Sequence, residues 1–136
     1  MSNAIQIEVS GEEQLRRRLR DLPEQIQESI LTEMIETAIT QIETEAKRNC
    51  RVDTGRLRSS IHTEYKARRI YDYTDDAGRG FSGDLNIDIQ DNEVVVGTNV
   101  EYAKTIEARY PFLFPALERA KPELKRRLMN IIRQMR

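Results

Sequence analysis

The segment that most constrains the fold of this 136-residue chain is a long amphipathic stretch over residues 24–49. Its apolar side chains recur every three or four positions, which places them on one face of an α-helix. They are Ile26, Ile30, Leu31, Met34, Ile35, Ala38, Ile39, Ile42 and Ala46. Such a helix spans about 39 Å, given the rise per residue of an α-helix. Because a single helix is only marginally stable in water, we expect a sheet or partner subunits along this face.

The residues before this helix predict a strand and a shorter helix. Apolar and polar residues alternate over residues 5–9, as in a half-buried strand. Ser10 and Glu13 have the spacing of a capping box for a helix over about 11–20. Pro23 then fits the first turn of the long helix, where a missing N–H costs nothing.

The middle of the chain has the composition of β-structure. Residues 61–73 are rich in β-branched and aromatic side chains. Residues 84–97 alternate and end in three valines, with a turn at Asp91 and Asn92, so they predict a β-hairpin. The segment TDDAGRGFSG, residues 74–83, predicts a mobile loop between strands.

Two more helices are expected near the C-terminus, over about 99–107 and 115–135, joined by a dense apolar loop at residues 110–115. Pro122 either kinks the last helix or restarts it as a first-turn residue. The whole pattern predicts an α+β fold in one domain over residues 1–136. In this fold a small antiparallel β-sheet packs against a long N-terminal helix and a C-terminal helix.

The net charge of −1 gives the chain as a whole no electrostatic attraction to DNA, but the charges are segregated. Residues 1–50 hold 6 Lys and Arg against 10 Asp and Glu, and residues 84–110 hold 2 against 6. Residues 111–136 hold 7 against 2. This basic end either binds nucleic acid or an acidic protein surface, or is a solvated helix face with cations near its C-terminus.

Cysteine and histidine usage excludes two kinds of site. Cys50 and His62 occur once each, so neither an intrachain disulfide nor a zinc site can be assembled from them. We expect Cys50 to be a small buried residue. No apolar run approaches the ~18 residues of a membrane span and no signal-peptide pattern is visible, so we expect a cytoplasmic start.

The glycine pattern GRGFSG at residues 78–83 matches G-x-G-x-x-G in letters only. In a dinucleotide-binding fold this pattern opens a helix whose N-terminus holds the pyrophosphate. Here it precedes the alternating segment 84–90, and the other motifs of a kinase are missing. We therefore interpret it as a hairpin loop and predict no bound cofactor.

No catalytic or metal-binding constellation emerges from the remaining polar residues. Asp72, Asp75 and Asp76 form an acidic cluster, but their spacing is not that of a calcium-binding loop. The stretch SSIH at residues 59–62 lacks the G-x-S-x-G context of a serine nucleophile. The sequence therefore predicts neither a metal site nor an enzyme.

The segment RVDTGRLRSSI, residues 51–61, interrupts the long helix. Asp53 or Thr54 can cap the short helical turn that follows, whose apolar face carries Leu57. We expect Gly55 to require a positive φ, so that Gly55→Ala harms folding.

The three arginines of this segment, Arg51, Arg56 and Arg58, allow two interpretations. They could bind phosphate at the capped turn. Alternatively, they belong to a structural turn and form salt bridges between subunits. The absence of alternating aromatic residues or a helix-turn-helix pattern favours the second.

Two segments together resemble one protein family. AKRNCRVDTGRLRSSI (46–61) resembles the signature A-x-x-x-x-P-V-D-T-G-x-L-x-x-S-I, with Arg51 in place of proline. VVVGTNVEYAKTIEARYPFLFPALERA (94–120) is similar to V-G-[TS]-x-x-x-Y-A-x-x-x-E followed by P-F-[LM]-x-P-A, with a shorter loop after Glu107. The family is the tail-component or neck proteins of long-tailed bacteriophages, typified by gene product ten of the HK97-type phage.

The resemblance implies a structural role in virion assembly, in tail completion or head–tail joining at the neck, as a ring around the DNA passage. Its other partners would be phage neck and tail proteins, with no small-molecule substrate and no membrane. The protein would occupy the host cytoplasm during assembly and then the virion. The matching positions carry over as assembly or structural residues. They are Asp53, Thr54, Gly55, Leu57, Tyr102, Ala103, Pro111, Phe112, Leu113 and Pro115.

Two other classes of function remain open on the residues alone. A small DNA- or RNA-binding regulator would use the basic C-terminal helix, and a salt-dependent shift of a DNA probe would indicate it. A small enzyme would reveal itself by an activity that depends on a metal or a nucleotide. If the protein assembles through its charged faces, we expect residues 111–136 to contact an acidic patch of a neighbour and high salt to weaken assembly.

Overall fold

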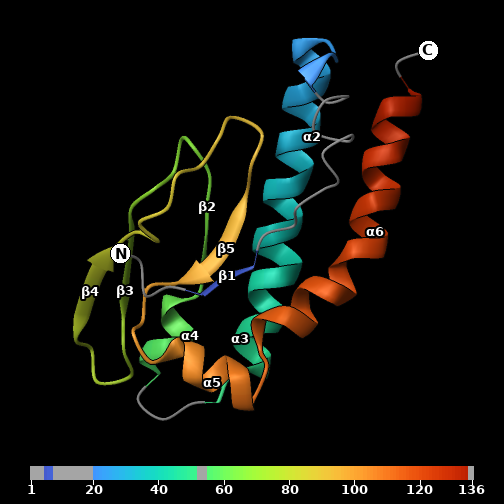
Figure 1. Cartoon of the computed structure of the whole chain (residues 1–136). Helices are drawn as coiled ribbons and strands as arrows, with labels where there is room; N and C mark the ends of the chain where they lie inside the picture. The colour runs from blue at the N-terminus through green and yellow to red at the C-terminus, as the bar shows by residue number, and fades with distance from the viewer. Residues whose placement is uncertain (1–4, 8–19, 52–54, 135–136) are drawn as a thin grey trace.

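The computed structural model describes residues 5–7, 20–51 and 55–134 (Figure 1). Its strands are β1 (Ile5–Ile7), β2 (His62–Glu64), β3 (Tyr71–Thr74), β4 (Gly80–Gly83) and β5 (Val95–Thr98). Its helices are α2 (Glu24–Thr37), η1 (Ala38–Glu43), α3 (Thr44–Asn49), α4 (Arg56–Ser60), α5 (Ala103–Arg109) and α6 (Leu113–Arg133). Small antiparallel sheets with a long helix at each end of the described chain confirm the predicted α+β class.

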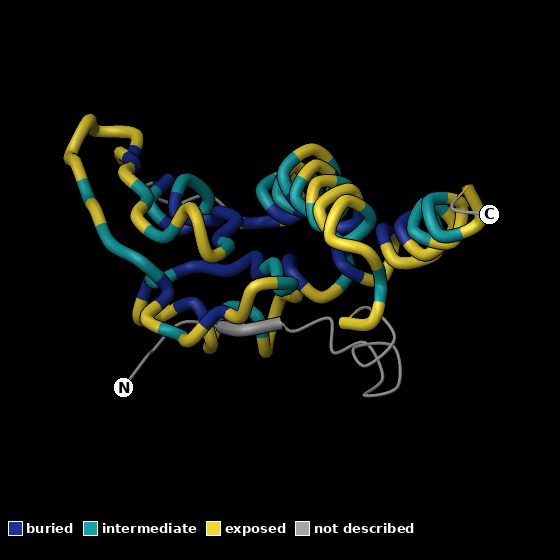
Figure 2. Tube along the Cα trace, turned by 90° about the horizontal axis from the view of Figure 1, so that it is seen from above, coloured by how far each residue is buried: buried dark blue, intermediate teal, exposed yellow. Residues whose placement is uncertain are grey.

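The elements form layers. The strands lie on one side, the continuous helix α2–η1–α3 lies in the middle, and α6 lies on the far side of that helix (Figure 2). α6 runs antiparallel to the long helix and packs against all three of its parts (Figure 1). The long helix therefore has its apolar side chains between two partners, as its unusually wide apolar face requires.

The predicted helix over residues 24–49 is confirmed, with one irregularity. Six residues in its middle, Ala38–Glu43, adopt π-helical geometry between two α-helical parts. A π-turn holds one more residue than an α-turn, so it rotates the side chains that follow it around the helix axis. Ile30, Ala38, Ile42 and Ala46 are buried along the helix. It ends at Cys50, whose backbone is extended.

The main sheet has three antiparallel strands in the order β1-β5-β2. The central strand β5 is buried along its whole length, as a strand covered on both faces should be. β1 confirms the predicted strand for residues 5–7. The expected end of that strand at Val9, the capping box of Ser10 and Glu13, and the helix over about 11–20 lie outside the described residues, apart from Arg20 at the end of that helix.

The predicted hairpin over residues 84–97 is wrong. Residues 84–90 form no strand, and β5 pairs with β1 and β2 instead. The alternation still reports burial, because Leu85 and Ile89 pack with Val95 in a small second cluster. The segment lies over the sheet as irregular chain, since both edges of β5 are already occupied by other strands. The turn at residues 91–92 is present.

The predicted loop over residues 74–83 is wrong at both ends. Gly80–Gly83 is strand β4, which pairs with β3 in a second sheet of two strands. Only residues 75–79 make the turn of this hairpin. The glycine-rich pattern therefore enters a strand rather than a helix, which removes the N–H array that a phosphate group would need.

The two helices near the C-terminus are confirmed with shifted starts. α5 begins at Ala103 because residues 101 and 102 form a turn, and α6 begins at Leu113, inside the predicted apolar loop. Pro122 lies within α6, and the helix bends part-way along its length (Figure 1). A proline inside a helix lacks the N–H for one backbone hydrogen bond and crowds the preceding turn, which gives such a bend.

Candidate functional site

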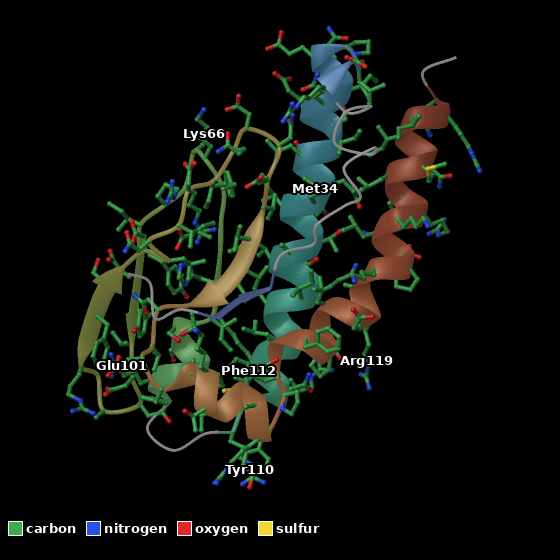
Figure 3. All side chains as sticks on the ribbon, in the orientation of Figure 1. Met34, Lys66, Glu101, Tyr110, Phe112 and Arg119 are labelled. Carbon is green, nitrogen blue, oxygen red and sulfur yellow. The ribbon has the colours of Figure 1, made fainter. Side chains whose placement is uncertain are left out.

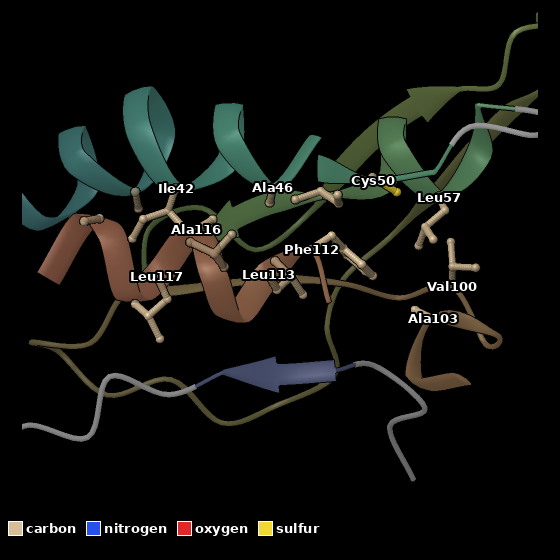
Figure 4. Close-up of a cluster of buried hydrophobic side chains, with 14 residues drawn as sticks. Ile42, Ala46, Cys50, Leu57, Val100, Ala103, Phe112, Leu113, Ala116 and Leu117 are labelled. Atoms are coloured by element: carbon tan, nitrogen blue, oxygen red, sulfur yellow. The ribbon is translucent and has the colours of Figure 1, made fainter. Parts of the chain in front are cut away.

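The two motif segments, residues 46–61 and 94–120, meet in the main hydrophobic core (Figure 4). The cluster consists of Ala38, Ile42, Ala46, Cys50, Leu57, Ile61, Val96, Val100, Ala103, Phe112, Leu113, Ala116, Leu117 and Ala120. Phe112, at 0% exposure, is the largest of its side chains. Asn49 Nδ2 donates a weak hydrogen bond of 3.5 Å to the carbonyl oxygen of Phe112. The end of the long helix is thus joined to the start of α6.

Glu107 fixes the start of α6 with one carboxylate. Its Oε2 accepts the N–H groups of Phe112 and Leu113 at 2.8 and 3.1 Å, and its Oε1 accepts the N–H of Phe114 at 2.9 Å. These N–H groups have no partner within the helix, and a carboxylate is favoured at this positive end of the helix dipole. Glu107 belongs to the motif but was not among the predicted site residues. Its signal is an acidic residue in the motif shortly before an apolar helix start.

Gly55 has the positive φ that the sequence predicted, at +81°. A Cβ on this residue would also lie 2.2 Å from Oδ1 of Asp76. The exposed carboxylate of Asp76 in the β3–β4 turn therefore lies against Gly55 and would have to rotate away from any larger side chain there. Leu57, two residues later, is buried in the core. Asp53 and Thr54 lie outside the described residues.

The arginines after this turn connect it to the β3–β4 hairpin and to the turn that precedes α5. Arg58 lies 3.5 Å from a carboxylate oxygen of Asp76. The two terminal nitrogens of Arg56, Nη1 and Nη2, donate to the carboxylate of Glu101 at 3.3 Å, and the same guanidinium lies 4.6 Å from the ring centroid of Phe81. These contacts are within one chain, and they hold the motif segments together at the surface.

Four aromatic rings form a stack from the core outward to this arginine. Successive centroids lie 4.4 Å apart from His62 to Tyr71, 5.9 Å from Tyr71 to Tyr73 and 5.3 Å from Tyr73 to Phe81. Tyr73 and Phe81 are direct cross-strand partners in the β3–β4 hairpin. The stack anchors this small hairpin, since two strands alone are marginally stable in water.

A hydrogen-bonded polar cluster lies buried under β2. His62 Nδ1 lies 2.7 Å from the carbonyl oxygen of Ser60, which can only accept, so this nitrogen donates. His62 Nε2 lies 2.5 Å from Oε2 of Glu64, and both side chains are 1% exposed. A proton must therefore lie between ring and carboxylate. The same Oε2 accepts the N–H of Leu85 at 2.8 Å, and Arg69 lies 3.5 Å from Oε1.

The hydroxyl of Ser60, near His62, has structural hydrogen-bond partners rather than catalytic ones. Ser60 Oγ lies 2.6 Å from the carbonyl oxygen of Leu57, to which it donates, and 2.5 Å from Oγ1 of Thr98. Thr98 must then donate to Ser60, and it also accepts the N–H of Val100 at 3.1 Å. This chain of hydrogen bonds ties α4 to the end of β5.

Other candidate chemistry also has a structural explanation. Burial raises the pKa of the Cys50 thiol to about 11, against a smaller lowering effect of Arg58. The thiol is therefore protonated at neutral pH and is a poor nucleophile. Desolvation favours a raised pKa for Asp75, but hydrogen bonds from Arg79 and Ala77 outweigh it and lower the pKa. No group of three potential metal ligands occurs among the described residues.

The remaining motif residues divide between core and surface. Ala103, Phe112 and Leu113 are buried, whereas Tyr102 is 40% exposed and Pro111 is exposed. Pro115 is half-buried. The structure thus brings the motif together around one corner, where α3, α4, α5 and the start of α6 meet (Figure 1).

This corner presents aromatic and cationic side chains to solvent. Tyr110 is 43% and Phe114 55% exposed, and the Arg51 guanidinium lies 3.5 Å from the ring centroid of Tyr110. Tyr110 projects from the end of the molecule (Figure 3). Arg109 is exposed beside it and has no carboxylate partner among the residues described. We call Arg51, Arg109, Tyr110 and Phe114 the aromatic–cationic end.

The described helices include none with the length and apolar character that crossing a bilayer requires. The fold and this corner define a small α+β protein whose shared motif builds a core and a rigid, exposed end. A sequence family described as "Bacteriophage HK97-gp10, putative tail-component" matches residues 13–108. The chain belongs to this family of phage tail components. Neither a curated protein nor a solved structure matches the chain significantly.

Proposed function

We propose that this chain is a structural virion-assembly protein of a tailed phage or prophage, acting in tail completion or head–tail joining at the neck. Its residues 1–136 work as one domain, in an oligomeric ring around the DNA passage, with other neck and tail proteins as partners. It is made in the host cytoplasm, becomes part of the virion and catalyses no reaction. Membership of the tail-component family supports the assembly role.

The observation that carries the proposal is the exposed aromatic–cationic end on a rigid base. Phe114 is held out in solvent while its backbone N–H is fixed by Glu107, and Phe112 beside it is fully buried. Tyrosine, other aromatics and arginine are enriched in the cores of protein interfaces. An exposed group of this kind on a rigid helix start is suited to binding another protein.

The alternative function, a regulator that binds DNA or RNA through α6, has less support. Arg119 binds Glu45 at 2.6 Å, and Arg127 binds Glu33 at 3.0 Å. Glu123 also binds Arg126 and Arg127 within α6. A helix whose cations are engaged in this way has fewer of them to offer to a phosphate backbone.

Deletion of the gene from the phage that encodes it tests the proposal. We expect heads and tails that fail to join, or tails that remain incomplete, and rescue by the wild-type chain supplied in trans. The double variant Tyr110→Ala/Phe114→Ala should fold but fail to rescue, whereas a matched variant at the exposed Ile70, Ile70→Ala, should rescue. Normal infectious virions from the deletion strain would contradict the proposed function.

A further inference from the structure

We propose that the aromatic–cationic end binds the acidic side of α2 on a second copy of this chain. This inference rests on the proposed function, because it names the contact between subunits of the assembly. The two surfaces are chemically complementary, since one is cationic and the other acidic, and they lie on different parts of the same molecule.

The first surface carries unpaired positive charge around apolar rings. Arg48, Arg51, Lys104 and Arg109 have no carboxylate partner among residues 20–51 and 55–134. Nearby carboxylates are engaged elsewhere, because Glu107 caps α6 and Glu101 binds Arg56. The exposed ring of Tyr110 therefore carries the unpaired guanidinium of Arg51 over its face, with Arg109 next to it in the chain. This composition selects a partner surface that is apolar in the middle and acidic around it.

The second surface is a stripe along α2. Glu24, Glu28, Leu31 and Ile35 follow one another at steps of four, three and four residues, so they lie on one side of the helix. Glu24 and Glu28 are exposed, and Leu31 and Ile35 are half-buried. No cation within the described part of the chain pairs with either glutamate. We call these four residues the acidic stripe, and it has the composition that the aromatic–cationic end requires.

The two surfaces cannot contact each other within one chain. Met34, in the same helix as the acidic stripe, and Tyr110 lie toward opposite ends of the molecule (Figure 3). A contact between unlike surfaces leaves one unused surface on each of the two copies, an acidic stripe on one and an aromatic–cationic end on the other. Such heterologous contacts close into a ring when the rotation between neighbours divides a full turn. The same geometry would explain how one small chain builds a ring without a special end subunit.

Charge reversal on each surface provides the test. One variant is Arg51→Glu/Arg109→Glu and the other is Glu24→Lys/Glu28→Lys. The matched control is Arg68→Glu/Asp72→Lys, which reverses two exposed charges on neither surface. Thermal unfolding monitored by circular dichroism confirms that each variant folds. The native mass is then measured by sedimentation over a concentration range, at low and at high salt.

We expect wild type and control to assemble at low salt and to dissociate as salt is added. Each reversed variant alone should associate roughly tenfold or more weakly, because like charges then face each other. An equimolar mixture of the two variants should regain assembly, since every contact in an alternating assembly is again between opposite charges. Phe114→Ala should weaken assembly at every salt concentration.

Three results would overturn the inference. They are a wild-type chain that stays monomeric at all concentrations, reversed variants that assemble like wild type, and a mixture that stays dissociated. A contact between two identical surfaces would leave one of the two reversed variants assembling like wild type, because that variant keeps its contact surface unchanged. These outcomes are independent of the phage test, since a tail component could join the virion through other proteins without any contact between its own copies.

Discussion

The molecule contains two interiors of different chemistry. Between the long helix and α6 the core is apolar and uses small residues such as Ala38, Ala46, Ala116 and Ala120, which let the backbones of the two helices approach closely. Under β2 the interior is polar, with His62 and Glu64 in direct contact at 2.5 Å. The stability of the apolar core depends on how well the volumes and shapes of its side chains fit together. The stability of the polar interior depends on every hydrogen-bonding group keeping its partner.

This difference predicts how each interior responds when a side chain is removed. An apolar core that loses a side chain keeps a cavity, and its neighbours relax in part. A buried charged or hydrogen-bonded pair that loses one partner leaves the other desolvated and unsatisfied. The following substitutions test the comparison, in order of decreasing expected effect.

Phe112→Ala tests the apolar core. Phe112 is 0% exposed, so we expect the free energy of unfolding to fall by about 3–5 kcal/mol. The control is Phe114→Ala, at 55% exposure two residues away, which should change stability by no more than about 0.5 kcal/mol. Urea denaturation measures both. Equal effects of the two substitutions would contradict the division of the motif into core and surface.

Glu64→Ala tests the polar interior. It leaves His62 Nε2 and the N–H of Leu85 without their acceptor, so we expect a loss of about 3 kcal/mol. The double variant His62→Leu/Glu64→Leu removes both partners and should cost less than the sum of the single variants His62→Leu and Glu64→Leu. A double-mutant cycle by chemical denaturation measures this coupling, and strictly additive losses would show that the pair does not act as a unit.

Gly55→Ala tests the contact between the α4 turn and the β3–β4 turn. The positive φ should cost about 1–2 kcal/mol, and the exposed carboxylate of Asp76 must in addition rotate away from the added Cβ and lose its ion pair with Arg58. Gly78→Ala is the control, because its φ is +84° but no atom lies within 4 Å of the added Cβ. It should lose only the conformational part, about 1 kcal/mol. If the two variants melt at the same temperature, the clash with Asp76 contributes nothing.

Glu107→Gln tests the cap that supports the aromatic–cationic end. Glutamine keeps one acceptor oxygen and loses the charge, so we expect a loss of about 1 kcal/mol in the free energy of unfolding. Assembly should weaken as well, because Phe114 is less firmly held. Glu101→Gln, at an exposed ion pair with Arg56, is the control and should change stability less. A Glu107→Gln chain with wild-type melting and assembly would exclude this role of the cap.

The apolar periodicity of the helices could be read from the sequence because it depends on spacing within one element. The helix over residues 24–49 and the C-terminal helix were predicted in this way. The strand pairing was not, because alternation reports which face is buried and says nothing about which strand lies alongside. Residues 84–90 alternate, yet β1 and β2 already occupy both sides of β5.

The candidate site shows the same division. Motif resemblance identified Phe112, Leu113 and the glycine turn, and it included Glu107 without revealing its capping role. The three N–H partners of Glu107 become neighbours only once the chain between α5 and α6 has folded back. The resemblance also missed the contact of Arg51 with Tyr110, which joins residues 59 positions apart in the sequence. Exposure of Phe114 beside buried Phe112 could not be inferred from composition, since both are phenylalanines in one apolar run.

By itself, the sequence determined the long helix over residues 24–49, the two helices near the C-terminus, the positive φ of Gly55 and the resemblance to a phage tail-component family. Each of these depends on the order of residues along a short segment. The tertiary structure alone decided which strands pair, that His62 and Glu64 meet out of contact with water, and which motif side chains face solvent. These depend on contacts between segments that are distant in the chain. Such contacts depend on how all the helices and strands pack together, because each strand edge or helix face can be buried against only one partner.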